Sequence, residues 1–503
     1  MSTRFFEPFR RTRLLAGAVA LLALAGCESP SGIEPGSSLR DPNSLEVGAD
    51  IRAAAQAGSS SASSSSASWP ADDWWSSYGD AQLDRLVARS LAGNPSLKAA
   101  EARFRNALAL AEIAGARELP SVEAEASIHR THNTARSFVP PPWAGASKWN
   151  NEASLSLSYD LDLWGKDEDA AEAAADRSAM QAAEGLKVRI DLETALVQKY
   201  VDLALQYDLR AVLQDTLGQE QRILDLTRRQ VAAGLGTEFD LSQVETPIPG
   251  TRAEIEQTDE AIGLIRHQIA ALAGEGPGFG ETLAQPSLRS GFSGALPDSL
   301  PAHLIGRRPD ILARRWQVEA ASKEIEAAKA DFYPDINLSL STGYAGTTFS
   351  QILSHKGITH DYGPAISLPI FTGGRLRGQL SEATAQYDAA VETYNGTVLS
   401  ALQQVADQVL RLRAVARERQ ETRQAMAVAH HAYDLAQRSY RAGLSGYLSV
   451  LNAQTQLFAA EQRDARVRAD GLGAYAGLMQ ALGGGLGADP GPERALKTAK
   501  AGE

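Results

Sequence analysis

Two long stretches, residues 166–233 and 375–442, dominate the pattern of apolar and polar positions along the chain. The first contains 68 residues with no proline and only two glycines, and it is dense in Ala, Leu, Gln, Glu and Arg. These residue types favour helix, and nothing in the stretch would break one. At about 1.5 Å per residue, such a helix would be roughly 100 Å long.

The spacing of glycines and prolines indicates that the chain contains a duplication. Each long stretch lies between glycines that are 69 positions apart, namely Gly165 and Gly234, and Gly374 and Gly443. Upstream, two pairs of sites match at an offset of 214 positions: Asn94-Pro95 with Arg308-Pro309, and Pro120 with Pro334. Equal spacings of this kind predict two copies of one unit. We expect each copy to contain a helix, two strands, the long helix and a further helix.

Four short segments alternate between apolar and polar residues, which predicts β-strands. They lie at about residues 121–130, 153–163, 335–344 and 364–372. Segments of about ten residues with one apolar and one polar face suit a membrane β-barrel with a wet interior. A soluble sheet with one solvated face alternates in the same way.

Acidic residues on the polar faces favour the barrel. They are Glu123, Glu125, Asp160 and Asp162, and carboxylates are rarely buried in a packed core. Four strands cannot close around a lumen, and lipid does not tolerate an open sheet edge. The sequence therefore predicts a barrel that is shared between chains.

Each long stretch ends at a glycine, where we expect the chain to reverse. The returning helices are predicted over residues 237–272 and 446–482. Pro247 and Pro249 fall inside the first of them. Each proline removes a helix hydrogen bond, so this helix is expected to be kinked or broken there.

Charge and cysteine content narrow the function classes. The net charge of −12 speaks against a nucleic-acid partner. The single cysteine, Cys27, provides neither a disulfide framework nor a thiolate metal cluster.

Cys27 follows a basic start and a short apolar run, which is typical of a signal peptide. Residues 24–27, Leu-Ala-Gly-Cys, resemble a bacterial lipobox, which implies cleavage before Cys27, lipidation of its thiol and, with Glu28 next, transfer to the outer membrane.

The predicted organisation has six parts. They are a signal peptide at 1–26, a lipidated flexible tether at 27–68, a first repeat at 69–273, an inter-repeat loop at 274–297, a second repeat at 298–482 and a mobile C-terminal tail at 483–503. The tether is Ser-, Gly- and Pro-rich, a composition that cannot bury a core.

Over about residues 69–484 the chain resembles the TolC-type outer-membrane efflux factors, closest to their lipoprotein branch (OprM/NodT-like). The resemblance rests on motifs in duplicated order, including Asn94-Pro95, Asp162-Leu163-Trp164-Gly165-Lys166, Arg308-Pro309-Asp310, Phe332-Tyr333-Pro334, Gly373-Gly374-Arg375 and Tyr440-Arg441-Ala442-Gly443. It implies a mainly α protein with a membrane β-barrel: a homotrimer in the outer membrane with a twelve-stranded barrel and a coiled-coil helical tunnel. It also implies that a periplasmic adaptor protein and an inner-membrane efflux pump dock at the periplasmic end.

The resemblance suggests two groups of site residues. The adaptor-docking tips are Gly234, Leu235, Gly443 and Leu444, and the tunnel aperture is assigned to Asp240, Tyr447, Ser449 and Asn452. Family members commonly place acidic residues where this chain has Ser449 and Asn452, so Asp240 is left as the carboxylate of the aperture. Asp240 also suits a helix start, where a negative charge is favourable. Tyr447 suits packing as well as constriction.

No motif in the sequence indicates an enzyme, a cofactor or a metal site. His430-His431 lacks the spacing of metal ligands, and residues 471–476 match a dinucleotide loop but follow a predicted helix instead of a strand. The preferred function is a passive exit duct for small molecules that takes its energy from a partner. The alternatives are a duct for type I protein secretion and a structural lipoprotein that braces the envelope.

Overall fold

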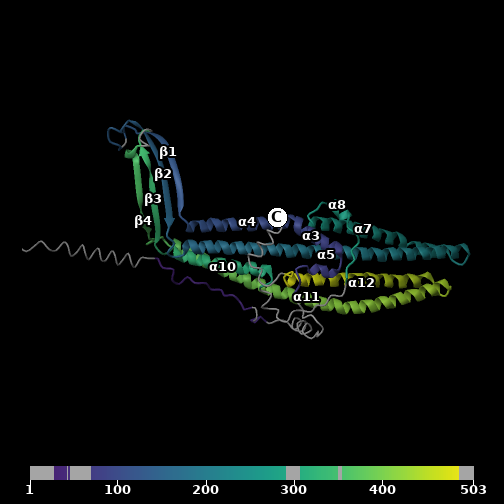
Figure 1. Cartoon of the computed structure of the whole chain (residues 1–503). Coiled ribbons are helices and arrows are strands. Elements are labelled where there is room, and N and C mark those ends of the chain that lie inside the picture. The colour runs from purple at the N-terminus through teal and green to yellow at the C-terminus, as the bar shows by residue number, and fades with distance from the viewer. Residues whose placement is uncertain are drawn as a thin grey trace, which may run out of the picture. The chain divides into compact units, whose positions relative to one another are not determined.

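The computed structural model describes residues 28–41, 44–45, 69–136, 138–289, 306–348 and 354–485 (Figure 1). The predicted signal peptide, Cys27, most of the tether and most of the C-terminal tail lie outside these residues. The chain forms two compact units: residues 1–39, 104–180 and 314–394 make the first, and residues 40–103, 181–313 and 395–503 make the second.

The first unit contains a four-stranded antiparallel sheet. Its strands, in the order β1-β2-β3-β4, are Ser121–His132, Ser147–Asp160, Asp335–Gly346 and Ile358–Ser367. The register places Val122 opposite Leu157, Leu157 opposite Leu340 and Leu340 opposite Tyr362. The apolar positions of all four strands therefore share one face of the sheet, as the alternation predicts.

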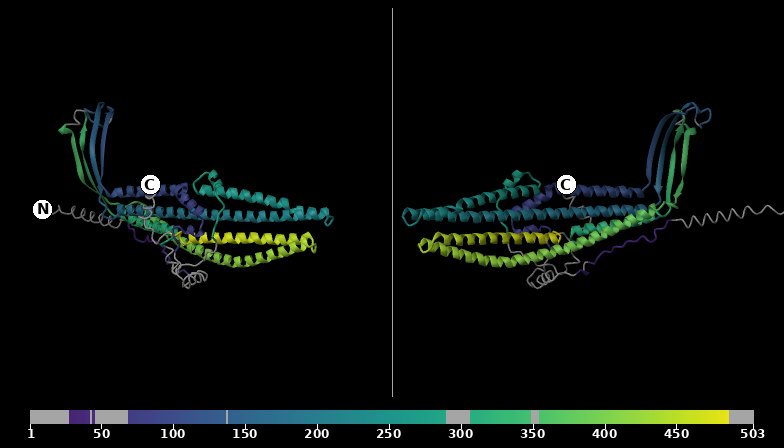
Figure 2. Two further views of the ribbon diagram at one scale, coloured as in Figure 1. Left: turned by 45° about the vertical axis from the view of Figure 1, so that its right-hand side comes forward. Right: turned by 180° about the vertical axis from the view of Figure 1, so that it is seen from behind.

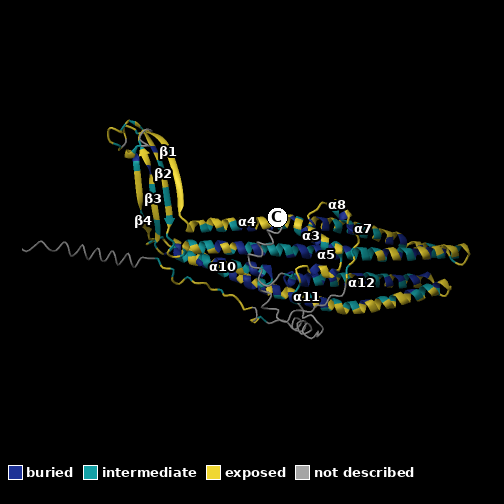
Figure 3. Cartoon of the chain, in the orientation of Figure 1, coloured by how far each residue is buried: buried dark blue, intermediate teal, exposed yellow. Residues whose placement is uncertain are grey.

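The strands differ from the prediction at their ends. β2 ends at Asp160 instead of residue 163, because Asp162 is already used to cap the next helix. β4 ends at Ser367 instead of residue 372, and Pro369 beyond it has no N–H to continue the ladder. Within the described sheet, β1 and β4 each pair on one side only. β1 is exposed along almost its whole length (Figure 3).

Two helices of 67 residues each follow the strand pairs: α5 is Lys166–Ala232 and α11 is Arg375–Arg441. Each begins at the predicted residue and ends one residue before the predicted end. The second unit holds the later part of both, together with α6 (Glu238–Glu245), α7 (Pro247–Leu272), α8 (Pro277–Glu281) and α12 (Tyr447–Ala481). In all views α7 lies beside α5, and α12 lies beside α11 (Figure 2).

The main core of the second unit forms around a short helical turn, η2 (Trp74–Tyr78), and α3 (Ala81–Gly93). Tyr78 and Leu83 are fully buried. The Tyr78 hydroxyl donates to the Leu472 carbonyl at 2.8 Å. This core joins residues of both repeats, since it also contains Leu196 and Val405.

The Asn94-Pro95 and Arg308-Pro309 motifs have equivalent structural roles in the two repeats. They precede α4 (Pro95–Gly115) and α10 (Pro309–Ala330). The Asn94 amide donates to the carbonyl of Leu272, the last residue of α7, at 2.8 Å. The Arg308 guanidinium donates to the carbonyl of Ala481, the last residue of α12, at 3.0 Å. Each motif therefore satisfies a carbonyl that the end of a helix leaves unpaired.

Residues 28–41, here called the N-terminal strap, run along α11 and differ from the predicted flexible tether. Three hydrogen bonds between backbone N–H groups and side-chain oxygens hold the strap. Gly374 N, just before α11, donates to Glu28 Oε1 of the strap at 2.8 Å. Ser37 N and Arg40 N of the strap donate to Asp388 Oδ1 and Asn395 Oδ1 of α11 at 2.9 and 3.0 Å. Ile33 packs on a core that contains Leu376 and Leu380. Composition alone suggests a tether, but specific partners on α11 order this segment.

None of the described helices combines the length and the apolar character that a bilayer span requires.

Candidate functional site at the helical turns

The turns after α5 and α11 are built in the same way. Gly234 has φ 74° and Gly443 has φ 71°, the left-handed conformation in which glycine carries no steric penalty. In the first turn, Gly234 N donates to the Val231 carbonyl and Leu235 N to the Gln230 carbonyl, both at 2.9 Å. The second turn repeats these bonds one for one. Both are Schellman motifs, which satisfy the last carbonyls of the helix.

Large apolar side chains project from both turns. The exposed fractions are 81% for Leu235, 82% for Leu444, 71% for Phe239 and 57% for Leu448. Apolar side chains gathered at one exposed place mark interaction sites more often than those scattered singly. The glycines position this surface, and the leucines after them supply its apolar contacts.

Asp240 is used by the start of its own helix. Its Oδ2 accepts from Thr237 N at 2.9 Å and from Thr237 Oγ1 at 2.7 Å, and Asp240 N donates back to Thr237 Oγ1 at 3.3 Å. This is a capping box. The hydrogen bonds from the Thr237 side chain and backbone lower the pKa of Asp240, so the carboxylate is ionised at neutral pH. The role of a helix cap therefore has direct geometric support.

The returning helix of the first repeat is divided at the prolines. α6 ends at Glu245 and α7 begins at Pro247, so the predicted break occurs at Thr246. Pro249 lies in the first turn of α7, where a missing N–H costs no helix bond. The second repeat has no such break, and α12 runs through 35 residues.

Tyr447 does not line an open surface of the chain, and its burial favours the packing role over constriction. It is 3% exposed and makes an edge-to-face contact with Tyr440 at a centroid distance of 6.1 Å. Its ring is apolar enough to join the packed core next to the turn. Ser449 and Asn452, on the same helix, are exposed.

A link between the two repeats close to the turns was not predicted from the sequence. Tyr440 OH lies 2.9 Å from Thr227 Oγ1 and donates to Gln230 Oε1 at 3.1 Å. These atoms join α11 to α5. The sequence shows Tyr440 only as part of a motif, and nothing local to it identifies residues 210 or more positions away as partners.

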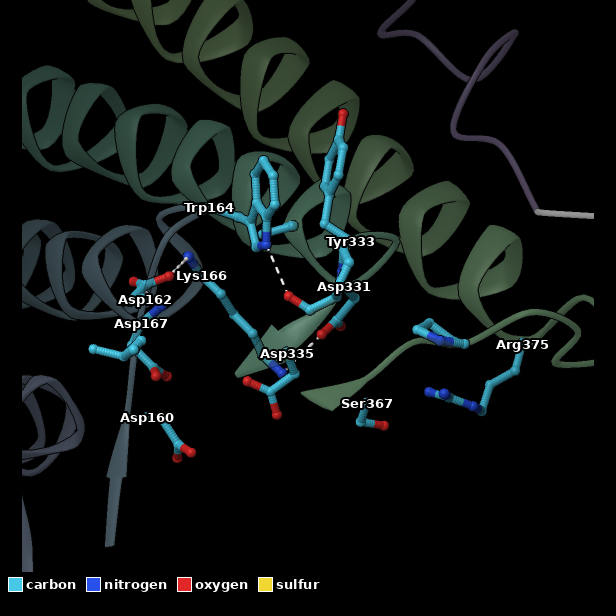
Figure 4. Close-up of a pocket in the computed structure, with 14 residues that line it drawn as sticks. Asp160, Asp162, Trp164, Lys166, Asp167, Asp331, Tyr333, Asp335, Ser367 and Arg375 are labelled. Atoms are coloured by element: carbon cyan, nitrogen blue, oxygen red, sulfur yellow. Dashed lines mark hydrogen bonds and ion pairs between the residues drawn. The ribbon is translucent and has the colours of Figure 1, made fainter. Parts of the chain in front are cut away.

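The first unit has a polar pocket of about 200 Å³ where strands meet helices (Figure 4). Asp162 accepts from the backbone N–H groups of Lys166 and Asp167 at 2.7 and 2.8 Å. Burial would raise the pKa of Asp162, but the backbone donors outweigh it and lower the pKa. Lys166 pairs with Asp331 at 2.8 Å, and Trp164 donates to the Pro334 carbonyl at 2.8 Å. These contacts fix the junction of β2 with α5.

The described residues contain no group of three or more His, Cys, Asp or Glu side chains that could hold a metal ion. His430 lies 3.7 Å from Asp434 on an exposed helix face.

Comparison with known proteins gives a consistent result. A family model described as "Outer membrane efflux protein" matches residues 86–275 and 300–484. The fusaric acid resistance protein FusA of Burkholderia cepacia is 41% identical over 377 residues, which cover 74% of this chain and 69% of that protein. The pyoverdine export outer membrane protein OpmQ of Pseudomonas putida is 29% identical over 432 residues, which cover 84% and 89% of the two chains.

Solved structures share the fold. The outer membrane protein VceC of Vibrio cholerae is 33% identical, with a TM-score of 0.77 over 83% of this chain and 100% of that chain. The outer-membrane channel OprN is 26% identical, with a TM-score of 0.79 over 90% and 99%.

Proposed function

Because the chain belongs to the outer membrane efflux protein family and is an efflux channel component, we propose that three copies assemble into one duct that adaptor and pump proteins engage at the helical turns. The observation that carries the proposal is the four-stranded sheet with two unpaired edges. Each open edge presents N–H and C=O groups that would cost several kcal/mol apiece in hydrocarbon. Pairing β1 of one copy with β4 of the next removes every edge at once.

Strand number and barrel size support an assembly of three copies. Four strands from each chain give twelve strands in a trimer. The diameter of a barrel grows with its strand number, and twelve strands exceed the eight that side chains can fill. A trimer therefore leaves a passage, as a duct requires. A brace would need neither the alternating strands nor the unpaired edges.

The docking surface is proposed to be the four exposed side chains Leu235, Phe239, Leu444 and Leu448. The partners are a periplasmic adaptor protein and an inner-membrane pump. We also propose that Cys27 carries a lipid, that Asp240 contributes to the aperture, and that the duct exports small organic molecules. The last point is supported by relatives named for fusaric acid resistance and pyoverdine export.

The test uses the full chain in a strain that lacks its own outer-membrane efflux channels. Native mass spectrometry of the extracted protein should give a mass three times that of the mature chain. Accumulation of a fluorescent efflux substrate should fall when the chain is expressed together with its adaptor and pump. A monomeric mass would refute the shared barrel. Export of a secreted protein without any change in small-molecule accumulation would favour the protein-secretion alternative.

A further inference from the structure

A packed core lies next to the two helical turns, here called the turn core. Its buried residues come from α5, α6, α7, α11 and α12 and are Ile223, Leu224, Val244, Ile248, Tyr433, Tyr440, Tyr447, Val450 and Leu457. The turn core therefore holds the returning helices of both repeats together. Polar side chains at its margin decide how tightly they pack, because an unpaired buried polar group opposes packing.

Glu220 of α5 is a carboxyl group buried in this region. It is 4% exposed, and its Oε1 accepts from the Thr251 hydroxyl of α7 at 3.0 Å. Its Oε2 has no hydrogen-bond partner among the described residues. A buried carboxylate with one donor for two oxygens is poorly compensated for the loss of water.

Two side chains of α12 have unpaired atoms in the same region. Gln454 is 4% exposed, and neither its amide nitrogen nor its amide oxygen has a partner in the described part of the chain. Tyr447 is 3% exposed, and its hydroxyl is likewise unpaired there. Gln454 lies on α12 between Val450 and Leu457, which both belong to the turn core. Burial raises the pKa of Tyr447 to about 12, and the charge of Glu220 adds to this shift.

The unpaired atoms of Glu220 and of α12 could complement each other as hydrogen-bond donor and acceptor. A protonated carboxyl has an O–H donor, which an ionised one lacks, and an amide or phenol oxygen can accept from it. Protonation of Glu220 at Oε2 would thus create a donor at the atom without a partner, in a region where Tyr447 and Gln454 of α12 have unpaired oxygens. Burial raises the pKa of Glu220; the hydrogen bond from Thr251 opposes this shift, and Glu254 of α7 adds to it. Tyr433 and Tyr440 of α11 also contribute to the raised pKa of Tyr447.

We infer that Glu220 is a proton-sensitive switch that controls how tightly α12 packs against α5 and α7 near the turns. The neutral acid completes the polar contacts of the turn core, and the anion leaves an unpaired charge inside it. This inference goes beyond the proposed function and does not depend on the partners proposed there.

The direction of the pH effect follows from linkage. The pKa of Glu220 in the packed state is raised above its ordinary value of 4.5. The packed state therefore binds the proton more tightly than the opened state. Packing is strongest below pH 4.5, weakens as the pH rises through the raised pKa, and is constant above it. The opening equilibrium changes tenfold for each pH unit within this window.

The experiment is hydrogen exchange with mass spectrometry on the full mature protein in detergent, from pH 4.5 to pH 8, with rates corrected for intrinsic exchange. Peptides covering residues 447–457 report on α12, and peptides covering residues 335–346 of β3, which pairs with a strand on each side, are the internal reference. In the wild type, protection of 447–457 is expected to fall at least threefold across the range, while that of the reference stays constant. Glu220→Gln cannot ionise and should abolish the pH dependence.

Two further variants control the interpretation. Glu254→Gln removes an exposed acid one turn from Thr251 that adds to the raised pKa of Glu220, so it should keep a pH dependence over a narrower pH window. Glu220→Leu replaces the carboxyl with an apolar side chain, and it should give pH-independent protection even if Glu220→Gln were to fold poorly. Protection that is independent of pH in the wild type, or a pH dependence that persists in Glu220→Gln and Glu220→Leu, would overturn the inference. Neither outcome bears on whether the chain forms an efflux duct.

Discussion

Replacing the exposed leucines at the turns with aspartate should abolish docking without unfolding the protein. Leu444 and Leu235 are 82% and 81% exposed, so the folded chain loses little packing when they are changed. Substitutions at such exposed sites usually change stability by at most about 0.5 kcal/mol. The glycines before them are poorer targets, because a side chain at φ near 70° would itself cost roughly 1–2 kcal/mol.

The expected loss of binding is larger than this change in stability. Full burial of a leucine is worth about 1.5–3 kcal/mol, so burying its exposed four-fifths against a partner contributes about 1.2–2.4 kcal/mol per side chain. A loss of about 2 kcal/mol weakens binding by roughly 30-fold. An aspartate placed in an apolar contact adds a desolvation cost, and a trimer repeats the loss three times.

The assay compares Leu235→Asp/Leu444→Asp with wild type in two ways: adaptor binding to the purified protein, and substrate accumulation in cells. Phe138→Asp is the matched control, since Phe138 is fully exposed in the loop between β1 and β2. We expect the double variant to lose adaptor binding and efflux while its melting temperature and oligomeric mass are unchanged, and the control to keep all four. Wild-type efflux and adaptor affinity in an intact double variant would refute docking at the turns.

Three other predictions concern separate parts of the chain. Arg308→Ala should destabilise the second unit by about 3–5 kcal/mol, measured by denaturant unfolding, because it leaves the Asp310 carboxylate and the Ala481 carbonyl without their buried donor; a change below 1 kcal/mol would contradict this. Asp240→Asn should lower cation selectivity and multivalent-cation block in planar bilayers, since it removes one negative charge from each copy; unchanged values would leave Asp240 as a helix cap alone. Cys27→Ser should lose fatty-acid labelling in growing cells, and label that persists in the variant would exclude this lipid site.

Residue types and spacing were enough to predict the long helices and the duplication. α5 ends within one residue of its expected end because Gly234 stops it and no proline interrupts it. The alternation in β2 fixes which residues share a face, but the strand's end depends on Asp162, whose carboxylate caps α5. The proline break between α6 and α7 was predictable for the same local reason.

Features that depend on contacts distant in sequence were not predictable. Tyr447 follows a glycine turn that resembles an exposed tip, yet packing against Tyr440 buries it. Glu220 is one of many carboxylates on a long polar helix, and only its burial and its hydrogen bond with Thr251 distinguish it. The strap resembles a linker in composition, because its partners lie on α11, more than 340 positions away.

The position of the strap along the chain has a consequence for the order in which the protein matures. Glu28 binds the start of α11 across 346 positions, and Arg40 binds Asn395 across 355. Contacts this distant in sequence bear the cost of closing a long loop and form late in folding. The strap has no surface to bind until the second repeat has emerged and folded, so residues 28–41 are expected to stay undocked until then. Docking of the strap is thus a final closing step, and protection of residues 28–41 from protease would report that a chain has completed its fold.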